Sequence, residues 1–349
     1  MTFITPTITD LSVSQAGLKD RLIHKMNQKT KPLGSLGLIE KLAIELALIN
    51  GQESIELQQP KAFIFAADHG LCEQGVSAFP QEVTWQMIEN FLAGGAAISV
   101  LCKAHGINMV VVDCGVKHEF GERDNLINLK VAHGSANSFT APAMTAQECQ
   151  QALENGQSLI QQYAGNVVLL GEMGIGNTSA AALLQSRLTG LDIASCTGAG
   201  TGLDSAAIDH KTAVLAQVLQ QHLNATSPLD CLAAMGGLEI ATMVGAILQA
   251  ASLNKIIVVD GFITSSAVLV ASKINPFVLQ RCIFSHQSDE KGHKALLASM
   301  AATPLLQLGL RLGEGSGAAL AWPLLVSAAA IMNNMASFES AGVSEKSVD

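Results

Sequence analysis

The sequence is poor in aromatic and in basic side chains, and both shortages restrict what the protein can do. Phe, Tyr and Trp make up 4% of the 349 residues, with a single tyrosine. Lys and Arg number 20 against 29 Asp and Glu, which gives a net charge of -9. An acidic chain without a basic run lacks the electrostatic attraction that nucleic-acid binding requires. We therefore expect no nucleic-acid partner, and a core filled mainly by Ala, Leu and Gly.

The cysteines form neither a disulfide framework nor a metal motif. Seven are scattered along the chain, and none belongs to a C-x-x-C pair. An odd, scattered set is typical of reduced thiols. The first residues, 1–7, are too polar for a signal peptide. These features together predict a cytoplasmic protein.

Charged side chains are missing from one long stretch, residues 315–338, which is the main candidate for a membrane span. This stretch contains Gly317, Pro323, Asn333 and Asn334, and most of its other residues are small. A membrane helix is normally a continuous run of large apolar residues. The composition therefore favours a buried helix, and we expect no membrane partner.

Short apolar runs alternate with helical segments over most of the chain. The runs 62–67, 109–112, 167–170, 256–259 and 281–285 predict strands. This alternation predicts an α/β fold with a mainly parallel, Rossmann-like sheet flanked by helices. In such sheets ligands bind beyond the carboxyl ends of the strands. Five polar residues follow the predicted strands: Asp68, Asp113, Glu172, Asp260 and His286.

Helical patterns at both ends of the chain suggest a second, smaller unit. Residues 18–26 and 38–49 have apolar side chains at helical spacing. We expect residues 56–319 to form the α/β catalytic domain, and residues 1–55 and 320–349 to form a small helical lobe. The segment 122–145 is polar, and we expect it to be irregular.

Three glycine-rich turns recur, at 171–178, 198–202 and 313–317. Glycine adopts positive φ and lets the backbone approach a ligand, so such turns suit phosphate groups. A Walker loop is excluded because G-x-x-x-x-G-K-[ST] is absent, and the glycine spacing does not match the dinucleotide fingerprint. Each turn by itself is equally compatible with a helix cap. Three of them together favour a phosphate-bearing ligand.

One carboxylate, Glu314, stands between Gly313 and Gly315 at the start of the long uncharged stretch. A carboxylate on a tight turn that opens a helix is suited to act as a base on a bound ligand. It is equally suited to complement the helix dipole without any catalytic role. The local sequence leaves both interpretations open.

Two other clusters of polar residues permit more than one interpretation. His286, Glu290 and His293 have the spacing of metal ligands on one helix face, but the residues between them are typical of a polar loop. We therefore expect no metal. The segment Asp68-His69-Gly70 either lines the cleft or caps the turn that follows it.

The glycine turns and three further motifs together resemble the nicotinate-nucleotide–dimethylbenzimidazole phosphoribosyltransferases. The turns read Gly-Glu-Met-Gly-Ile-Gly-Asn-Thr at 171–178, Gly-Ala-Gly-Thr-Gly-Leu-Asp at 198–204 and Leu-Gly-Glu-Gly-Ser-Gly at 312–317. The other motifs are Ala-Ala-Asp-His-Gly at 66–70, Gly-Val-Ser-Ala-Phe-Pro-Gln-Glu-Val-Thr at 75–84 and Lys-Pro-Leu-Gly-Ser-Leu-Gly at 31–37. The similarity extends over nearly the whole chain.

This resemblance implies an enzyme that moves phosphoribose from nicotinate mononucleotide to dimethylbenzimidazole. The products would be α-ribazole phosphate, for the nucleotide loop of cobalamin, and nicotinate. It also implies a homodimer that uses no metal and no other cofactor.

The resemblance further implies roles for individual residues. Glu314 would be the general base that removes the ring proton of the acceptor. The residues implied for the nucleotide phosphate and ribose are Gly174, Gly176, Asn177, Thr178, Gly200, Thr201, Gly202 and Lys211. Those implied for the acceptor base are Ser77, Gln86, Glu172, Met173 and Leu312.

Three other functions remain open at this stage. The same transfer to another acceptor, such as adenine, depends on pocket shape. A non-catalytic nucleotide-binding module is the second, and Glu314 in its glycine frame argues against it. A dinucleotide-dependent oxidoreductase is the third, and the missing fingerprint disfavours it.

Overall fold

The computed structural model describes residues 3–200 and 202–344, and a six-stranded sheet organises this part of the chain. The strands are β1 (Lys61–Ala67), β2 (Asn108–Gly115), β3 (Leu126–Asn128), β4 (Val167–Met173), β5 (Ile256–Val259) and β6 (Cys282–Phe284). Their order is β3-β2-β1-β4-β5-β6, and all neighbours are parallel. The predicted parallel sheet is confirmed. Its strand order reverses between β1 and β4, where such sheets bind their ligands.

Two details of the sheet differ from the sequence-based expectation. Strand β3 lies within the segment 122–145, which was expected to be irregular. It is a three-residue edge strand with no fully buried side chain, so it leaves no apolar pattern in the sequence. Strand β4 continues through Gly171 and Glu172 to Met173, where the sequence suggested a turn. Glu172 is therefore a buried residue of the sheet, paired in register with Phe65 of β1.

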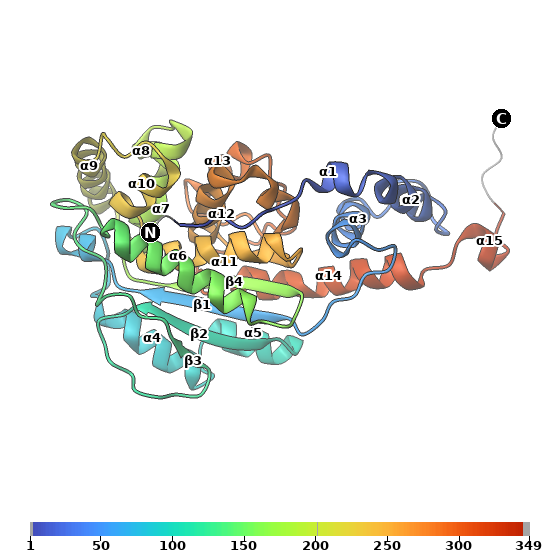
Figure 1. The fold of residues 1–349 in the computed structure, drawn as a ribbon, viewed down its shortest axis with the longest axis horizontal. Coiled ribbons are helices and arrows are strands. Elements are labelled where there is room, and N and C mark those ends of the chain that lie inside the picture. The colour runs from blue at the N-terminus through green and yellow to red at the C-terminus, as the bar shows by residue number, and fades with distance from the viewer. Residues whose placement is uncertain (1–2, 201, 345–349) are drawn as a thin grey trace.

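Helices cover both faces of the sheet, as Figure 1 shows. Alternate residues of β1 belong to two different apolar clusters: Phe63 and Phe65 to one, Ile64 to the other. The first cluster includes α6 (Ala146–Gln161), α7 (Asn177–Thr189), α9 (Ser205–Gln221), α10 (Pro228–Met235), α11 (Leu238–Ser252) and α12 (Phe262–Ile274). The second includes α2 (Ala16–Asn27), α3 (Leu38–Asn50), α4 (Glu82–Leu92), α5 (Ala97–His105) and α14 (Ser316–Asn334). The remaining short helices are α1 (Leu11–Ser14), η1 (Gly70–Gln74), α8 (Ile193–Cys196), η2 (Pro276–Arg281), α13 (His293–Ser299) and α15 (Phe338–Ala341).

The terminal helices gather at one end of the molecule. Helix α1 contacts α2, α2 packs against α3, and α3 packs against α14 (Figure 1). One apolar cluster joins Leu46 of α3 to Ile64 of the sheet. We keep the division into a catalytic domain of residues 56–319 and a terminal helical lobe as a proposal.

Two helical stretches, Glu82–His105 and Ser316–Asn334, are long and apolar enough to cross a membrane by length and composition. The first contains α4 and α5, and the second is α14, which packs against α3 and α5.

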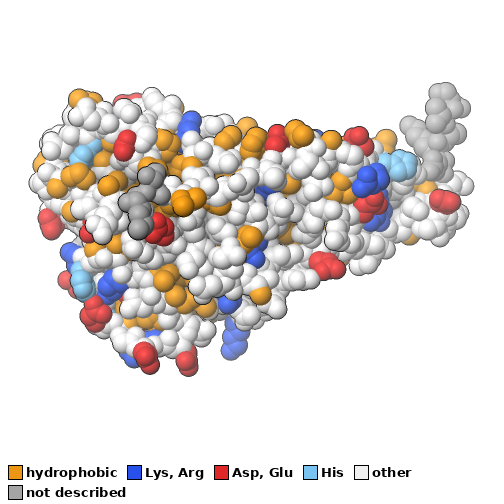
Figure 2. All heavy atoms as spheres, viewed as in Figure 1, with side chains coloured by type: hydrophobic (Ala, Val, Ile, Leu, Met, Phe, Trp, Pro, Cys, Tyr) orange, Lys and Arg blue, Asp and Glu red, His pale blue; other side chains and the backbone are white. Residues whose placement is uncertain are grey.

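On the face drawn in Figure 2, the Lys and Arg side chains are scattered singly or beside acidic ones.

The packing of α6 on α11 depends on two glycines that let the helix backbones touch. A Cβ atom at Gly156 of α6 would overlap the carbonyl oxygen of Thr242, and one at Gly245 of α11 would overlap that of Leu153. Backbone atoms cannot move aside as a flexible side chain can. The two helices therefore approach as closely as they do only because both positions lack a side chain.

We predict that Gly245→Ala lowers the free energy of unfolding by about 1–3 kcal/mol, because the new methyl group overpacks the α6–α11 contact. Chemical denaturation of both proteins measures the change. Gly17→Ala in α2 is the matched control, since its Cβ would meet only the Arg21 side chain at 3.8 Å. That control should be unchanged or up to about 1 kcal/mol more stable. Equal effects of the two substitutions would contradict this account of the packing.

Candidate active site

A cavity of about 360 Å³ opens beyond the carboxyl ends of β4, β5 and β6. Strand β4 contributes Glu172 and Met173 to its wall, and the loop before α14 contributes Leu312 and Glu314. A smaller recess of about 20 Å³ adjoins this cavity and includes Lys211. Both are lined by four further residues: Gly174, Asn177, Thr178 and Gly200. One continuous site therefore has an apolar part with carboxyl groups and a part that holds a buried cation.

Glu314 lies on a turn with unusual backbone geometry. Gly313, Glu314 and Gly315 have φ angles of 82°, 65° and 89°, all in the left-handed region. A residue with a side chain adopts this conformation at a cost of order 1–3 kcal/mol, so the surrounding structure must hold it there. A Cβ atom at Gly171 of β4 would collide with the Glu314 backbone, so Gly171 allows the turn to lie directly against the sheet.

The environment of Glu314 favours the protonated form of its carboxyl group. The residue is 6% exposed, and its Oε2 atom has no hydrogen-bond partner among the described residues. Burial raises the pKa of Glu314 to about 7, although the Ile98 backbone lowers it, and the negative charge of Asp260 adds to the increase. A carboxyl group with this pKa can accept and release a proton near neutral pH.

Glu172 places a second buried carboxyl group in the same site. Asn177 donates a hydrogen bond to its Oε2 atom, and any side chain at Gly313 would collide with its Oε1 atom. Burial raises the pKa of Glu172 to about 8, and Asp260 adds to this effect. Burial and the charge of Asp260 raise the pKa of both carboxyl groups, so the site retains protons at neutral pH.

The recess combines a helix N-terminus with a buried ammonium group. Gly176, with φ of 94°, caps α7 at its N-terminus, where the first backbone N–H groups lack partners within the helix. Lys211 is 1% exposed, and its Nζ atom donates to Thr178 Oγ1 over 2.9 Å. Burial lowers the pKa of Lys211 to about 8, although Glu290 opposes this, so the group is largely charged at neutral pH. Oriented amides and one cation are the groups that bind phosphate.

The structure brings most of the residues predicted for the site together, but not all. Ser77 lines the recess rather than the larger cavity, and Gln86 is exposed on α4 and lines neither. Their assignment to the acceptor base stays a prediction. Gly202 is exposed in a turn. Thr201 lies outside the described residues.

Several apolar residues that line the larger cavity were not predicted from the sequence. Phe79 stands at its edge with 48% of its surface exposed, and Val83 and Met87 face the cavity from α4. Val83 and Met87 are four residues apart, so they share one helix face. This spacing indicates an apolar helix face, whereas the polar Gln86 of the same helix was assigned to the acceptor base from the sequence.

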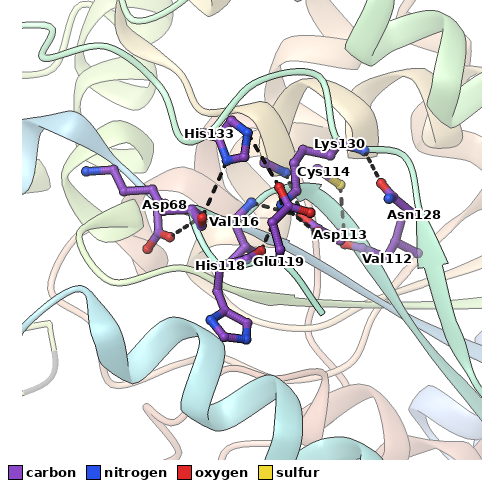
Figure 3. Close-up of polar contacts among 12 residues, drawn as sticks. Asp68, Val112, Asp113, Cys114, Val116, His118, Glu119, Asn128, Lys130 and His133 are labelled. Carbon is purple, nitrogen blue, oxygen red and sulfur yellow. Dashed lines mark hydrogen bonds and ion pairs between the residues drawn. The ribbon is translucent and has the colours of Figure 1, made fainter. Parts of the chain in front are cut away.

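Asp68, after β1, and Asp113, near the end of β2, organise the loop that follows β2 (Figure 3), and neither lines the cavity. Asp113 Oδ1 accepts hydrogen bonds from the Gly115 and Val116 backbone at 3.1 and 2.9 Å, and its Oδ2 lies 3.5 Å from Lys130 Nζ. Asp68 Oδ2 accepts one from the Lys117 backbone at 2.9 Å. These contacts occupy both oxygens of Asp113, whereas Asp68 Oδ1 has no hydrogen-bond partner among the described residues.

His69 belongs to a buried ion pair. Its Nε2 atom lies 2.6 Å from Glu239 Oε1, and the ring is 2% exposed. Burial opposes charging of the ring, but the carboxylate of Glu239 outweighs it and raises the pKa of His69. Of the two predicted roles for the Asp68-His69-Gly70 segment, cleft lining is not seen, because none of the three residues lines the cavity or the recess.

The metal interpretation of residues 286–293 finds no support in the geometry. His293 Nδ1 accepts a hydrogen bond from the Ser288 backbone at 2.8 Å, and its Nε2 lies 3.0 Å from Ser265 Oγ. Both ring nitrogens are thus occupied within the protein. Among the described residues, no group of three or more His, Cys, Asp or Glu side chains is arranged to hold a metal ion.

Comparison with known proteins identifies relatives over nearly the full length. A family model, DBI_PRT, described as a phosphoribosyltransferase, matches residues 12–343. The nicotinate-nucleotide–dimethylbenzimidazole phosphoribosyltransferase of Variovorax paradoxus is 55% identical over 341 residues, 98% of this chain and 97% of the relative. That of Dechloromonas aromatica is 52% identical over 97% and 99% of the two chains. The crystal structure of CobT from Thermus thermophilus is similar with a TM-score of 0.92 and 38% identity, covering 95% of this chain and all of that one.

We predict that Glu172→Gln stabilises the protein at alkaline pH. Glu172 has a pKa of about 8 in the folded protein and an ordinary value of 4.5. Between these two values the folded state binds more protons, so wild-type stability falls as the pH rises. The variant lacks this loss and should be more stable by on the order of 2–4 kcal/mol at about pH 9.

Urea unfolding at about pH 4 and pH 9 measures the difference, which should vanish at the lower pH. Glu339→Gln on exposed α15 is the control and should change neither value. Equal stabilities of wild type and Glu172→Gln at the higher pH would contradict the raised pKa.

Proposed function

Because this chain belongs to the DBI_PRT phosphoribosyltransferase family, we propose that the cavity and the recess form one active site for nucleotide and base. The protein is a nicotinate-nucleotide–dimethylbenzimidazole phosphoribosyltransferase. It transfers phosphoribose from nicotinate mononucleotide to dimethylbenzimidazole, a step in cobalamin synthesis. One observation carries the assignment of the site. A buried carboxyl group with a pKa of about 7 faces an apolar cavity that continues into a recess with a buried lysine.

In this proposal the phosphate of the nucleotide lies at the mouth of the recess. The phosphate lies at the N-terminus of α7, against the amides that follow Gly176 and the ammonium group of Lys211. The ribose extends past Asn177 and Gly200 into the larger cavity. This arrangement uses backbone amides for most of the phosphate contacts, which explains how an acidic protein binds an anionic substrate.

The acceptor base lies in the apolar part of the cavity. Val83, Met87 and Met173 pack against its flat ring, and Leu312 covers its edge. Burial in this environment removes water that would otherwise compete as the nucleophile. The nitrogen that attacks must face the anomeric carbon, while the other ring nitrogen faces Glu314.

Glu314 drives the transfer as a general base. One acceptor nitrogen forms a bond to the anomeric carbon while the bond from that carbon to the pyridinium nitrogen breaks. The electron pair of the broken bond leaves with nicotinate and neutralises its ring nitrogen. Glu314 takes the proton of the second acceptor nitrogen, which prevents a positive charge from remaining on the product. Attack opposite to the leaving group converts the β-nucleotide into the α-nucleotide.

The direct test is incubation with nicotinate mononucleotide and a panel of bases, with the products identified by mass and by anomeric configuration. The proposal predicts α-ribazole phosphate and free nicotinate when dimethylbenzimidazole is present. A faster reaction with adenine would support the alternative acceptor. Tight nucleotide binding with no product would indicate a non-catalytic binding module.

We further propose that the enzyme works in the cytoplasm as a homodimer. Light scattering after size-exclusion chromatography measures the mass in solution. A species of 36.4 kDa, the mass of one chain, would contradict the homodimer.

Glu314→Gln keeps the size of the side chain but cannot accept the proton. We predict that turnover falls by roughly 10²–10⁴-fold while nucleotide affinity stays close to that of the wild type. Steady-state kinetics and equilibrium binding of nicotinate mononucleotide separate the two quantities. Glu339→Gln should leave both unchanged. Near-normal turnover in folded Glu314→Gln would remove Glu314 from the mechanism.

Lys211→Met removes the cation of the recess and retains most of the apolar volume. Affinity for nicotinate mononucleotide should fall by roughly 10–100-fold, because a charge-assisted contact is lost. Affinity for nicotinate riboside, which has no phosphate, should change little. Calorimetric titration with both ligands checks this. Equal losses for the two ligands would show that Lys211 supports the fold and does not contact the phosphate.

A further inference from the structure

We propose that Asp260, the residue after β5, is the positioning residue of the catalytic carboxylate and holds the turn on which Glu314 stands. This inference rests on the proposed function, since it assigns Asp260 a role through Glu314. Asp260 is not among the residues that line the cavity or the recess. Its effect on the reaction therefore passes through the turn and not through contact with a substrate.

Three hydrogen bonds join Asp260 to the turn. Its Oδ2 atom accepts from the Gly315 backbone at 3.1 Å, and its Oδ1 atom accepts from Gly317 and Ala318 at 2.7 and 3.1 Å. Asp260 is 1% exposed, so water does not compete for these contacts. The nearest of the three amides in sequence belongs to the residue directly after Glu314.

The turn needs an acceptor from outside because its own backbone satisfies the Ser316 amide, through the Gly313 carbonyl oxygen, but no side chain caps the helix. Gly315 is the N-cap of α14, and a glycine has no side chain to accept from the first amides of the helix. A Ser or Asp at this position would satisfy those amides but would strain a backbone with φ of 89°. Asp260 reaches the same amides from a neighbouring strand, so the left-handed turn and a capped helix coexist.

The position of Asp260 is itself fixed on two sides. It follows β5 directly, so the sheet sets its backbone. His286, after β6, has its Nε2 atom 3.6 Å from Asp260 Oδ1. A Cβ atom at Gly317 would collide with the His286 ring, which leaves no space for the turn to shift in that direction. The carboxylate thus ties the catalytic turn to the ends of two strands.

Asp260 also acts on Glu314 through its charge. The titratable groups around the cavity come from several elements: Glu172 from β4, His286 and Glu290 after β6, and Arg311 from the loop that carries Glu314. Helix α5 contributes the Ile98 backbone, which lowers the pKa of Glu314. Burial raises this pKa most, and the negative charge of Asp260 adds to the increase. Neutralising Asp260 should therefore lower the pKa of the base.

The simpler alternative is that Asp260 only caps α14 and stabilises the fold. In that case Asp260→Asn lowers the melting temperature, but its effect on turnover is independent of Glu314. A double-mutant cycle separates the two roles. The four proteins are the wild type, Asp260→Asn, Glu314→Gln and the double variant, each assayed with nicotinate mononucleotide and dimethylbenzimidazole across pH.

If Asp260 acts through Glu314, Asp260→Asn lowers turnover by roughly 10–100-fold in the wild-type background, as expected for a displaced catalytic group. It causes no further loss when Glu314 is already Gln. The acidic inflection of kcat/KM also moves to lower pH. An equal fold loss in both backgrounds, or an unshifted inflection, would overturn the proposal.

Asp113→Asn is the matched control, because Asp113 likewise accepts hydrogen bonds from backbone amides at the end of a strand, those of Gly115 and Val116. Its turnover and pH profile should stay near those of the wild type. Should Asp260→Asn not fold, Asp260→Glu keeps the charge but displaces the turn, and it should lose turnover with the inflection retained. Normal turnover in Asp260→Glu would overturn the proposal. Absence of product from the wild type would instead refute the proposed function.

Discussion

Burial of acidic groups at the carboxyl ends of β4 and β5 is the constraint on which the rest of the site depends. Glu172, Asp260 and Glu314 are each at most 6% exposed. Charged carboxylates are costly in such an environment unless amides or cations compensate them. Asp260 receives three backbone amides, whereas Glu314 Oε2 receives no hydrogen bond from the described residues. This difference separates a structural carboxylate from one that is available to take a proton.

Glycines make this arrangement possible by removing side chains where backbone segments must touch. Gly171 admits the Glu314 turn to the sheet, and Gly313 leaves space for the carboxyl group of Glu172. Gly176 begins the helix whose amides face the recess. Gly171 thus lets the base lie against the apolar cavity, and Gly176 begins a helix where the phosphate is proposed to bind. One parallel sheet therefore holds both halves of the reaction beyond the carboxyl ends of its strands.

The strength of the local pattern decided which features were predictable from the sequence. The helix predicted at residues 38–49 is found as α3, because its apolar side chains recur at helical spacing between Gly37 and Gly51. The parallel sheet followed from alternating strands and helices. Glu172 was placed correctly at a strand end but not recognised as part of β4, since a glycine beside a carboxylate resembles a turn. Val83 and Met87 were missed because a cavity wall and a buried helix face have the same apolar spacing. The three contacts of Asp260 join residues 55 to 58 positions apart, and no local pattern encodes such distances.

The central claim is that the fold raises the pKa of Glu314 to near neutral pH before any substrate binds. Carbon-13 NMR of the glutamate side-chain carboxyl groups tests it directly, with Glu314→Gln used to assign the signal. We expect Glu314 in the ligand-free protein to titrate with a pKa of about 7. The acidic inflection of kcat/KM, which reports the free enzyme, should have the same value. Titration near the ordinary value of 4.5, or an inflection unrelated to the NMR value, would contradict the account.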